Sequence, residues 1–362
     1  MSTKQDMKKI RYAVIGLGAI AENRIIKEGF AYDKSRFTPL PNAELAGVTD
    51  NDPRRKKTAV TLGTRWFRSS EEIFKSKDID AVIIATNNAS HASLAKVAIE
   101  AGKHCLVEKP MATTIKNALL LKRLAQKNKV SLAVDHIMQH NVFNIMARDL
   151  LAKGRIGTVN DICLHMEMLY GSTPTEISSW RCAQPENLGG PIGDIGSHCF
   201  YMAEFLLKSR ITALSCVYYP KTLEINVENG AYIKFETQSG MAGSIRVAFS
   251  EPRGGLMASL SNLGYEVYGT EGILRTYAAL FQLSGYKDEP AKVRLEVEDT
   301  NKLKEYAVSK IANIYQSVIH EHAQSIITGK FNDGLEGVHN LKLILAAHRS
   351  GTENGCKVWI SK

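Results

Sequence analysis

A short apolar segment that runs directly into a glycine turn is the feature that most constrains the fold of this chain. Residues 11–15 favour a buried strand, and Gly16-Leu-Gly18-Ala-Ile-Ala21 follows at once, before helix-compatible residues to about Gly29. Strand, glycine turn and helix in this order are typical of dinucleotide-binding α/β domains. Because such a short pattern also occurs in a simple strand-to-helix turn, its surroundings decide between the two interpretations.

Each position of the glycine turn has a physical role in binding a pyrophosphate. Gly16 allows the tight turn, and Gly18 lets the backbone come close to phosphate. The helix N-terminus that follows offers unpaired N–H groups. The candidate cofactor-binding residues of this turn are Gly16, Gly18, Ala19 and Ile20.

A carboxylate at the end of the next predicted strand supports the dinucleotide interpretation. Residues 43–49 are predicted as that strand, and Asp50 follows, where it can accept hydrogen bonds from both ribose hydroxyls of adenosine. The segment 30–42 is predicted to be an insertion that places Asp50 farther from the glycines than usual. A carboxylate repels a 2′-phosphate, so we favour NAD over NADP. The basic run 54–57 leaves NADP as the alternative, or else it forms an exposed helical turn after Pro53.

The first part of the chain continues as alternating strands and helices. Strands are expected at 81–85, 104–107 and 130–134, with helices at 91–101 and 115–128. Glu108-Lys109-Pro110 ends the strand at 104–107, so this charged pair lies at the carboxyl end of a strand, where open parallel sheets bind ligands. A parallel α/β domain over residues 8–134 is therefore predicted.

The second part changes to a pattern of mainly strands. They are predicted at 159–169, 211–219, 231–237, 242–249, 265–269 and 293–297. A helix from about Asp194 to Leu207 is expected to pack on this sheet through Phe200, Ala203, Phe205 and Leu206. The fold class is thus an α/β and α+β chain: a Rossmann dinucleotide-binding domain, then an α+β domain over residues 135–362 with a large, mainly antiparallel sheet.

Composition narrows the class of protein. The chain has 362 residues, of which 44% are apolar and 23% charged, which predicts about two globular domains. No apolar run reaches the ~18 residues of a membrane helix, and residues 1–9 lack an apolar signal block, so a cytoplasmic protein is expected. The net charge of +9 comes from dispersed basic residues, which predicts no nucleic-acid partner. Six scattered cysteines without metal-ligand spacing predict reduced thiols and no metal site.

Taken in order, these motifs resemble the Gfo/Idh/MocA family, whose members include glucose-fructose oxidoreductase and inositol 2-dehydrogenase. The resemblance rests on the glycine turn, Asp50, a turn with Asn88 and His91, and Glu108-Lys109-Pro110. It continues through Gly154–Gly157, Trp180-Arg181 and Gly189-Gly190-Pro-Ile-Gly-Asp194-Ile-Gly196-Ser-His198, then Gly269–Gly272 and a closing helix at 334–350. It therefore covers nearly the whole chain, and it implies that the domain over residues 135–362 binds substrate and makes the contacts between subunits.

The resemblance implies further site residues. Thr86, Asn88, His91, Glu108 and Lys109 join the candidate cofactor-binding residues. The segment from His136 to Val142 departs from the usual family pattern of an aromatic, two arginines and Phe-Asp-Pro. This segment commonly borders the substrate, so His136 and Gln139, with Asp135 and His140, are candidate hydroxyl-binding groups or else part of a polar loop between domains.

Two candidate acid–base groups, Lys109 and His198, suit the oxidation of an alcohol. Asp194 and His198 are four residues apart, so a helix places them on one face. An N-cap aspartate and a core histidine are the alternative interpretation. We assign His198 as general base, Asp194 as the group that orients it, and Lys109 as the group that stabilises alkoxide character. The roles of Lys109 and His198 reverse if a desolvated Lys109 is the base.

The function implied is an NAD-dependent oxidoreductase that transfers hydride between a sugar, inositol or related polyol and nicotinamide. The alternatives are an NAD-assisted glycoside hydrolase and a non-catalytic, nicotinamide-responsive regulatory protein. A homodimer or homotetramer is expected, because in the family the sheet face opposite the helices commonly makes subunit contacts. The strands of that sheet carry apolar residues such as Val247 and Phe249.

Overall fold

The computed structural model describes residues 9–251, 262–282, 284 and 292–361. The chain divides into two compact units, one of Met1–Ile137 with Asn313–Val338 and the other of Met138–Ala312 with His339–Lys362. Residues 1–8, part of the N-terminal segment in which no signal block was expected, lie outside the described residues. The functional division into 8–134 and 135–362 stays a prediction.

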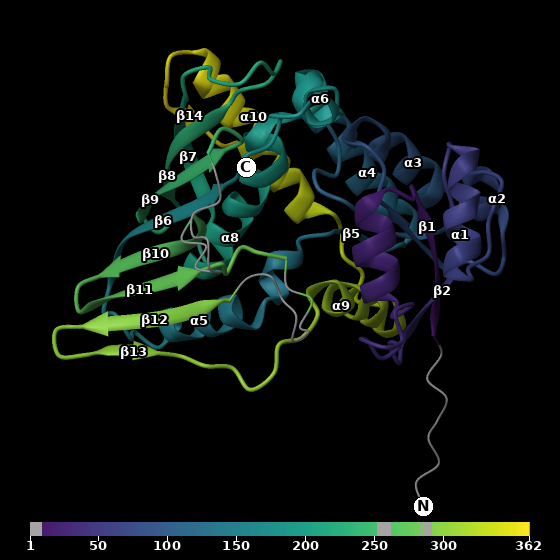
Figure 1. The fold of residues 1–362 in the computed structure, drawn as a ribbon, viewed down its shortest axis with the longest axis horizontal. Coiled ribbons are helices and arrows are strands. Elements are labelled where there is room, and N and C mark those ends of the chain that lie inside the picture. Colours follow the sequence, from purple (N-terminus) through teal and green to yellow (C-terminus); the bar gives the residue numbers. More distant parts are fainter. Residues whose placement is uncertain (1–8, 252–261, 283, 285–291, 362) are drawn as a thin grey trace, which may run out of the picture. The chain divides into compact units, whose positions relative to one another are not determined.

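The first unit is built on a five-stranded parallel sheet with strand order β2-β1-β3-β4-β5 (Figure 1). Its strands are β1 (Ile10–Ile15), β2 (Ala43–Thr49), β3 (Ala81–Ile84), β4 (His104–Val107) and β5 (Leu132–Val134). Its helices are η1 (Ile20–Gly29), η2 (Pro53–Arg55), α1 (Lys56–Leu62), α2 (Ser70–Lys75), α3 (Asn88–Glu100), α4 (Ile115–Asn128) and α9 (Ile314–Thr328).

Helix α9 packs on the sheet of the first unit although it comes late in the sequence. It packs against η1, β1 and β2. The Tyr12 hydroxyl in β1 and Nδ1 of His322 in α9 are 2.9 Å apart and buried, and the Asn313 amide donates to the Glu28 carboxylate at 2.8 Å. The N-terminal sheet is therefore completed by a helix from near the end of the chain.

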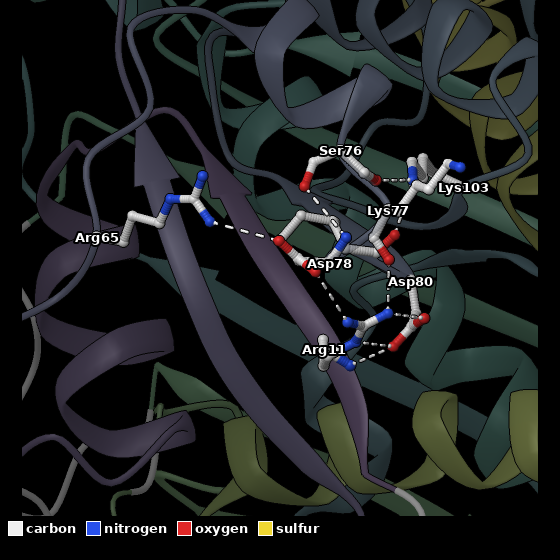
Figure 2. A network of polar contacts seen from close by, with 8 residues as sticks. Arg11, Arg65, Ser76, Lys77, Asp78, Asp80 and Lys103 are labelled. Carbon is white, nitrogen blue, oxygen red and sulfur yellow. Dashed lines mark hydrogen bonds and ion pairs between the residues drawn. The ribbon is translucent and has the colours of Figure 1, made fainter.

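The amino ends of the central strands are tied together by a polar network (Figure 2). Arg11 in β1 forms an ion pair with Asp80, which directly precedes β3, at 3.0 Å. Lys103, which precedes β4, donates to the carbonyls of Ser76 and Ile79 at 2.6 and 2.8 Å. These contacts fix the loops at the amino edge of the sheet, opposite the edge that carries the motifs.

The second unit contains a nine-stranded sheet with order β13-β12-β11-β10-β6-β9-β8-β7-β14. Only the β6–β9 pair is parallel among these described pairings, so the sheet is mainly antiparallel, as predicted. The strands are β6 (Val159–Glu167), β7 (Ile211–Tyr218), β8 (Gly230–Thr237), β9 (Ala242–Ala248), β10 (Leu263–Gly269), β11 (Gly272–Tyr277), β12 (Arg294–Asp299), β13 (Leu303–Glu305) and β14 (Val358–Trp359).

Helices cover one face of this sheet (Figure 1), with α5 against β12 and α8 against β6. The helical segments are η3 (Ile137–His140), α5 (Val142–Ala152), α6 (Pro174–Ile177), α7 (Trp180–Ala183), η4 (Pro185–Asn187), η5 (Ile192–Gly196), α8 (Ser197–Leu207) and α10 (Leu335–Thr352), of which η3 and α10 cross the division between units. Within the described residues, no helix is both long and apolar enough to span a membrane.

The expectation that Val247 and Phe249 belong to the sheet face that makes subunit contacts is wrong. Val247 is fully buried and faces Gly196 of η5, and Phe249 is fully buried against the ring of Tyr170, so neither contributes to an exposed sheet face. Phe205 is partly buried, with the guanidinium of Arg148 4.8 Å from its ring centre, and its packing on the sheet stays a prediction. The apolar strand residues alternate with polar ones, and it is the apolar set that faces the helices.

Candidate active site

The glycine turn has the geometry expected of a phosphate-binding turn. Gly16 has a φ of +92°, and a Cβ atom there would lie 2.7 Å from the Ala85 carbonyl oxygen, so only glycine fits. A Cβ atom on Gly18 would meet no heavy atom of the described residues within 4 Å. Helix η1 then begins at Ile20, and Ala19 provides no side-chain cap in this described segment. The turn thus presents open space and a helix N-terminus to a ligand.

Asp50 is held against this turn by backbone groups. One carboxylate oxygen accepts from the Leu17 N–H at 2.6 Å, and the other accepts from the Asp52 N–H at 2.8 Å. Asp52 in turn caps the helical turn of residues 53–55 and binds Arg54, whose side chain is 88% exposed. The basic run therefore forms the exposed helical turn that was one of its two interpretations.

All five strands bring a candidate residue or motif to the same edge of the sheet. In a parallel sheet the carboxyl ends lie together, so the glycine turn after β1, Asp50 after β2 and Thr86 after β3 share this edge with the segments after β4 and β5. Glu108 and Lys109 follow β4, and Asp135 and His136 follow β5.

His91 lies between two of these loops. It is 1% exposed, its Nδ1 lies 2.9 Å from the Pro110 carbonyl oxygen, and its Nε2 lies 3.2 Å from that of Thr86. Burial lowers the pKa of His91, so the neutral ring donates to one carbonyl only. Asn88, in the first turn of α3, is also buried. The peptide bond between Lys109 and Pro110 is cis. His91 therefore fixes the loop that carries Lys109.

The segment after β5 lies deeper than the sequence indicates. Asp135 and His136 are 2% and 3% exposed. Burial, and next the positive charge of Lys109, lowers the pKa of His136 to about 3, so its imidazole is neutral in the physiological range. Burial lowers the pKa of His140 to about 4. The imidazoles of His136 and His140 are therefore both neutral.

In the second unit, a glycine-rich segment shapes the start of α8. Gly190 has a φ of +84°, and a Cβ atom there would lie 2.6 Å from both oxygens of the buried Glu228 carboxylate. Glu228 accepts from the Ile192 N–H at 2.9 Å and thereby anchors the first residue of η5, and burial raises its pKa to about 7. The glycine lets a buried acid reach the helix that carries Asp194.

Asp194 and His198 lie on this continuous helical segment. Asp194 is inside η5, whose N-cap is Pro191, while Gly196 is the N-cap of α8, so the interpretation of Asp194 as an N-cap is wrong. Its carboxylate pairs with Arg181 of α7 at 3.3 Å. His198 is in the first turn of α8 and is 6% exposed. The pairing fixes the carboxylate one helical turn before the histidine.

Gln139 joins the same helix through a residue that the sequence interpretation missed. The Tyr201 hydroxyl, three residues after His198, donates to the Gln139 side-chain oxygen. Arg181 and Glu228 were also not assigned a role. The Trp180-Arg181 dipeptide was a visible signal for Arg181, whereas no pattern in the sequence marked Glu228 or Tyr201.

Replacing Gly190 with alanine is expected to destabilise the second unit by about 1–3 kcal/mol, the cost of strained backbone, with a further cost from crowding Glu228. Gly240→Ala is the matched control, because Gly240 has a similar φ of +85° but a Cβ atom there meets no described atom within 4 Å. Chemical denaturation measures both variants. Equal losses would show that the contact with Glu228 relaxes without cost.

Both parts of the chain match known proteins. Residues 10–136 match the model of an oxidoreductase family with an NAD-binding Rossmann fold, and residues 145–275 match that of the GFO/IDH/MocA C-terminal domain. The chain is 29% identical over 269 residues to 1,5-anhydro-D-fructose reductase from Ensifer adhaerens, covering 73% of this chain and 74% of that protein. It is 26% identical over 270 residues to scyllo-inositol 2-dehydrogenase (NAD⁺) from Bacillus subtilis, covering 73% and 72%.

Solved structures share the fold. An aldose-aldose oxidoreductase from Caulobacter crescentus, complexed with glycerol, superposes with a TM-score of 0.82 at 21% identity, covering 97% of this chain and all of that one. A 3-ketoreductase from Actinomadura kijaniata, in complex with NADP and TDP-benzene, gives a TM-score of 0.80 at 20% identity, with 95% and 98% covered. At these identities the likeness supports the architecture of both units.

Proposed function

The chain belongs to the Gfo/Idh/MocA family of oxidoreductases, with an NAD(P)-binding Rossmann fold, and from this premise we propose that it is an NAD-dependent enzyme. It transfers hydride between nicotinamide and a hydroxyl group of a sugar, inositol or related polyol. The observation that carries the proposal is the gathering of the glycine turn, Asp50 and Lys109 at the carboxyl edge of one parallel sheet. Relatives named as a sugar reductase and an inositol dehydrogenase support the substrate class.

The residues of this edge fit a dinucleotide. The open space at Gly18 and the start of η1 suit a pyrophosphate, and Asp50 suits the adenosine ribose. Thr86, Asn88, His91 and Glu108 border the loops on which the nicotinamide half would rest. When bound, nicotinamide accepts or gives the hydride.

Lys109 supplies a positive charge for the reacting oxygen. It lies two residues beyond β4, in a loop fixed by the contact of His91 with Pro110. Its ammonium donates a hydrogen bond to the substrate oxygen and stabilises alkoxide character as the hydroxyl is oxidised.

His198 moves the proton in this mechanism. Its imidazole takes the hydroxyl proton during oxidation and returns it to the oxygen during reduction. Asp194 orients the ring and stabilises its protonated form, while Arg181 holds that carboxylate at 3.3 Å. His136 and Gln139 are proposed to bind further hydroxyls, the first as a neutral ring and the second from its contact with Tyr201.

A panel of sugars and polyols tests the reaction. The panel contains scyllo-inositol, glucose and a glucoside with NAD, and 1,5-anhydro-D-fructose with NADH, each repeated with the phosphorylated cofactor. The proposal expects substrate-dependent production or consumption of NADH. Free sugar released from a glycoside without net NADH would instead indicate the glycoside hydrolase, and binding of cofactor with no turnover across the panel would indicate a regulatory protein.

NAD is expected to bind at least about tenfold more tightly than NADP, because like charges in contact cost several kcal/mol and 1.4 kcal/mol is tenfold. The like charges are the 2′-phosphate and Asp50, which the Leu17 and Asp52 amides hold in place. Titration of both cofactors measures the preference, and Asp50→Ala should narrow it. Arg54→Ala is the control and should leave the preference for NAD in place, since Arg54 pairs with Asp52 and not with Asp50. Equal or tighter NADP binding by the unmodified protein would overturn the assignment of NAD.

Assembly and location stay predictions of the proposed function. A homodimer or homotetramer would use the sheet face opposite the helices, where Tyr232 and Arg246 lie together and Tyr232 is 52% exposed. A cytoplasmic location and the lack of a nucleic-acid partner remain expectations from the sequence. Among the described residues no cluster of three or more His, Cys, Asp or Glu side chains is arranged to hold a metal ion.

A further inference from the structure

Two acidic residues are placed side by side by the register of adjacent strands. Strands β4 and β5 are parallel, with Val107 opposite Val134, so the next residues, Glu108 and Asp135, leave the sheet side by side. The Asp135 N–H donates to the Val107 carbonyl at 2.8 Å, which extends the ladder to this point. The backbone positions of the two acids therefore stay adjacent as long as the sheet edge is intact.

Asp135 is in surroundings that disfavour a carboxylate. It is 2% exposed, and its Oδ1 has no hydrogen-bond partner among the described residues. Burial raises the pKa of Asp135 well above its usual range, and the charge of Glu108 and a hydrogen bond between the two carboxyl groups raise it further. A buried acid in this position is stable when it keeps its proton.

The groups that face this pair define its charge. Lys109 lies beside it and is the positive group that favours ionisation of Asp135. His136 is neutral, as its pKa is about 3. From α9, Tyr315 also faces the pair, and burial followed by the charges of Glu108 and Asp135 raises its pKa, so this phenol stays neutral as well. One proton shared by the two acids leaves one negative charge opposite one ammonium.

We propose that Asp135 is a positioning residue for Lys109: it shares one proton with Glu108, and the pair presents a single negative charge that holds the ammonium in place. The proton stays within the pair, and no bond to substrate or cofactor is made by Asp135. The effect on turnover rests on the role of Lys109 in the proposed function, whereas the shared proton does not.

The shared proton is tested by stability against pH. A group whose pKa is raised in the folded state contributes stability that is lost as pH rises through that pKa. Asp135→Asn mimics the protonated acid and removes this loss. The ratio of the unfolding constants of the unmodified protein and this variant should therefore change by up to about tenfold per pH unit, in favour of the variant as pH rises.

A matched control lies at the other end of the same sheet. Asp80 pairs with Arg11 at 3.0 Å at the amino edge (Figure 2), so Asp80→Asn removes a carboxylate from the sheet without touching the pair. The infrared band of protonated carboxyl groups at neutral pH, to which buried Glu228 also contributes, should be equally strong in the unmodified protein and in Asp80→Asn, and weaker by one carboxyl group in Asp135→Asn. Parallel stability curves for Asp135→Asn and the unmodified protein, or an unchanged band, would overturn the shared proton.

The positioning role is tested by turnover with scyllo-inositol and NAD and with 1,5-anhydro-D-fructose and NADH. Asp135→Val, which leaves Glu108 without its donor, should lower kcat by about ten- to a hundredfold, the scale of a misplaced catalytic group, with little change in KM for the cofactor. Asp135→Asn should restore it. Equal kcat in Asp135→Val and the unmodified protein, while Lys109→Ala abolishes turnover, would overturn the positioning role and leave the proposed function intact. Turnover that survives Lys109→Ala would overturn both the proposed function and the positioning role, and the infrared and stability results would still decide the shared proton.

Discussion

Replacing Lys109 or His198 with alanine is expected to lower turnover by at least about 100-fold, the lower range for a positioned acid–base group. Lys109→Ala removes the ammonium that stabilises the alkoxide, and His198→Ala removes the imidazole that takes the proton. NAD affinity should change little, because the phosphate and ribose groups are assigned to the glycine turn and Asp50. Steady-state kinetics and NAD titration measure the two effects separately.

The pH profile of the same variants separates the two roles. If His198 is the base, kcat/KM of the unmodified enzyme should fall as pH drops through the range in which imidazoles titrate, because a protonated ring accepts no proton. This acidic limb should vanish or move in His198→Asn and survive, at a lower rate, in Lys109→Met. The reverse pattern would make Lys109 the base, and near-normal turnover in both variants would remove these residues from the mechanism.

Gly18→Val should abolish detectable cofactor binding while the protein stays folded. A Cβ atom at Gly18 meets no described atom within 4 Å, so the chain itself has room for the side chain. The same space is the one that a pyrophosphate needs, and a branched side chain would fill it. Calorimetric titration with NAD measures the loss, and thermal unfolding checks the fold.

Gly18→Ala provides the graded control, since one methyl group should weaken binding less than the valine. A folded Gly18→Val protein with unchanged NAD affinity would contradict the assignment of the glycine turn. The corresponding change at Gly16 is less informative, because a side chain there collides with Ala85 and threatens the fold as well.

The sequence predicted the architecture well wherever a local pattern determines the element. Strand β3 and helix α4 were predicted within one residue of their bounds, and η1 ends at Gly29 as expected. Helices α5 and α9 and strand β11 were not predicted, although each of the two helices begins at an asparagine N-cap, Asn141 and Asn313, which is a local signal that the sequence carries. Grouping α9 with the first unit requires contacts between residues about 300 positions apart, such as Tyr12 with His322, and no local pattern records these.

The candidate site was predicted only where its residues lie in local sequence patterns. The glycine turn and the strand ends carry their own signal, so their common edge could be inferred from the order of residues alone. The burial of Asp135 depends on strand register and on α9, and the pairing of Asp194 with Arg181 depends on how α7 approaches η5. Tertiary contacts of this kind leave no periodic pattern in the sequence, so the sequence did not predict them.

The late position of α9 also affects how the protein is made. On the ribosome the five strands of the first sheet emerge long before residues 314–328, yet β1 and β2 rest against that helix. Until it arrives, the apolar surface that it covers stays exposed to the cell, and exposed surface of this kind makes folding intermediates prone to aggregation. The N-terminal sheet therefore gains this cover only when nearly the entire polypeptide has been made, and we expect a nascent chain halted before residue 314 to expose the surface that α9 covers.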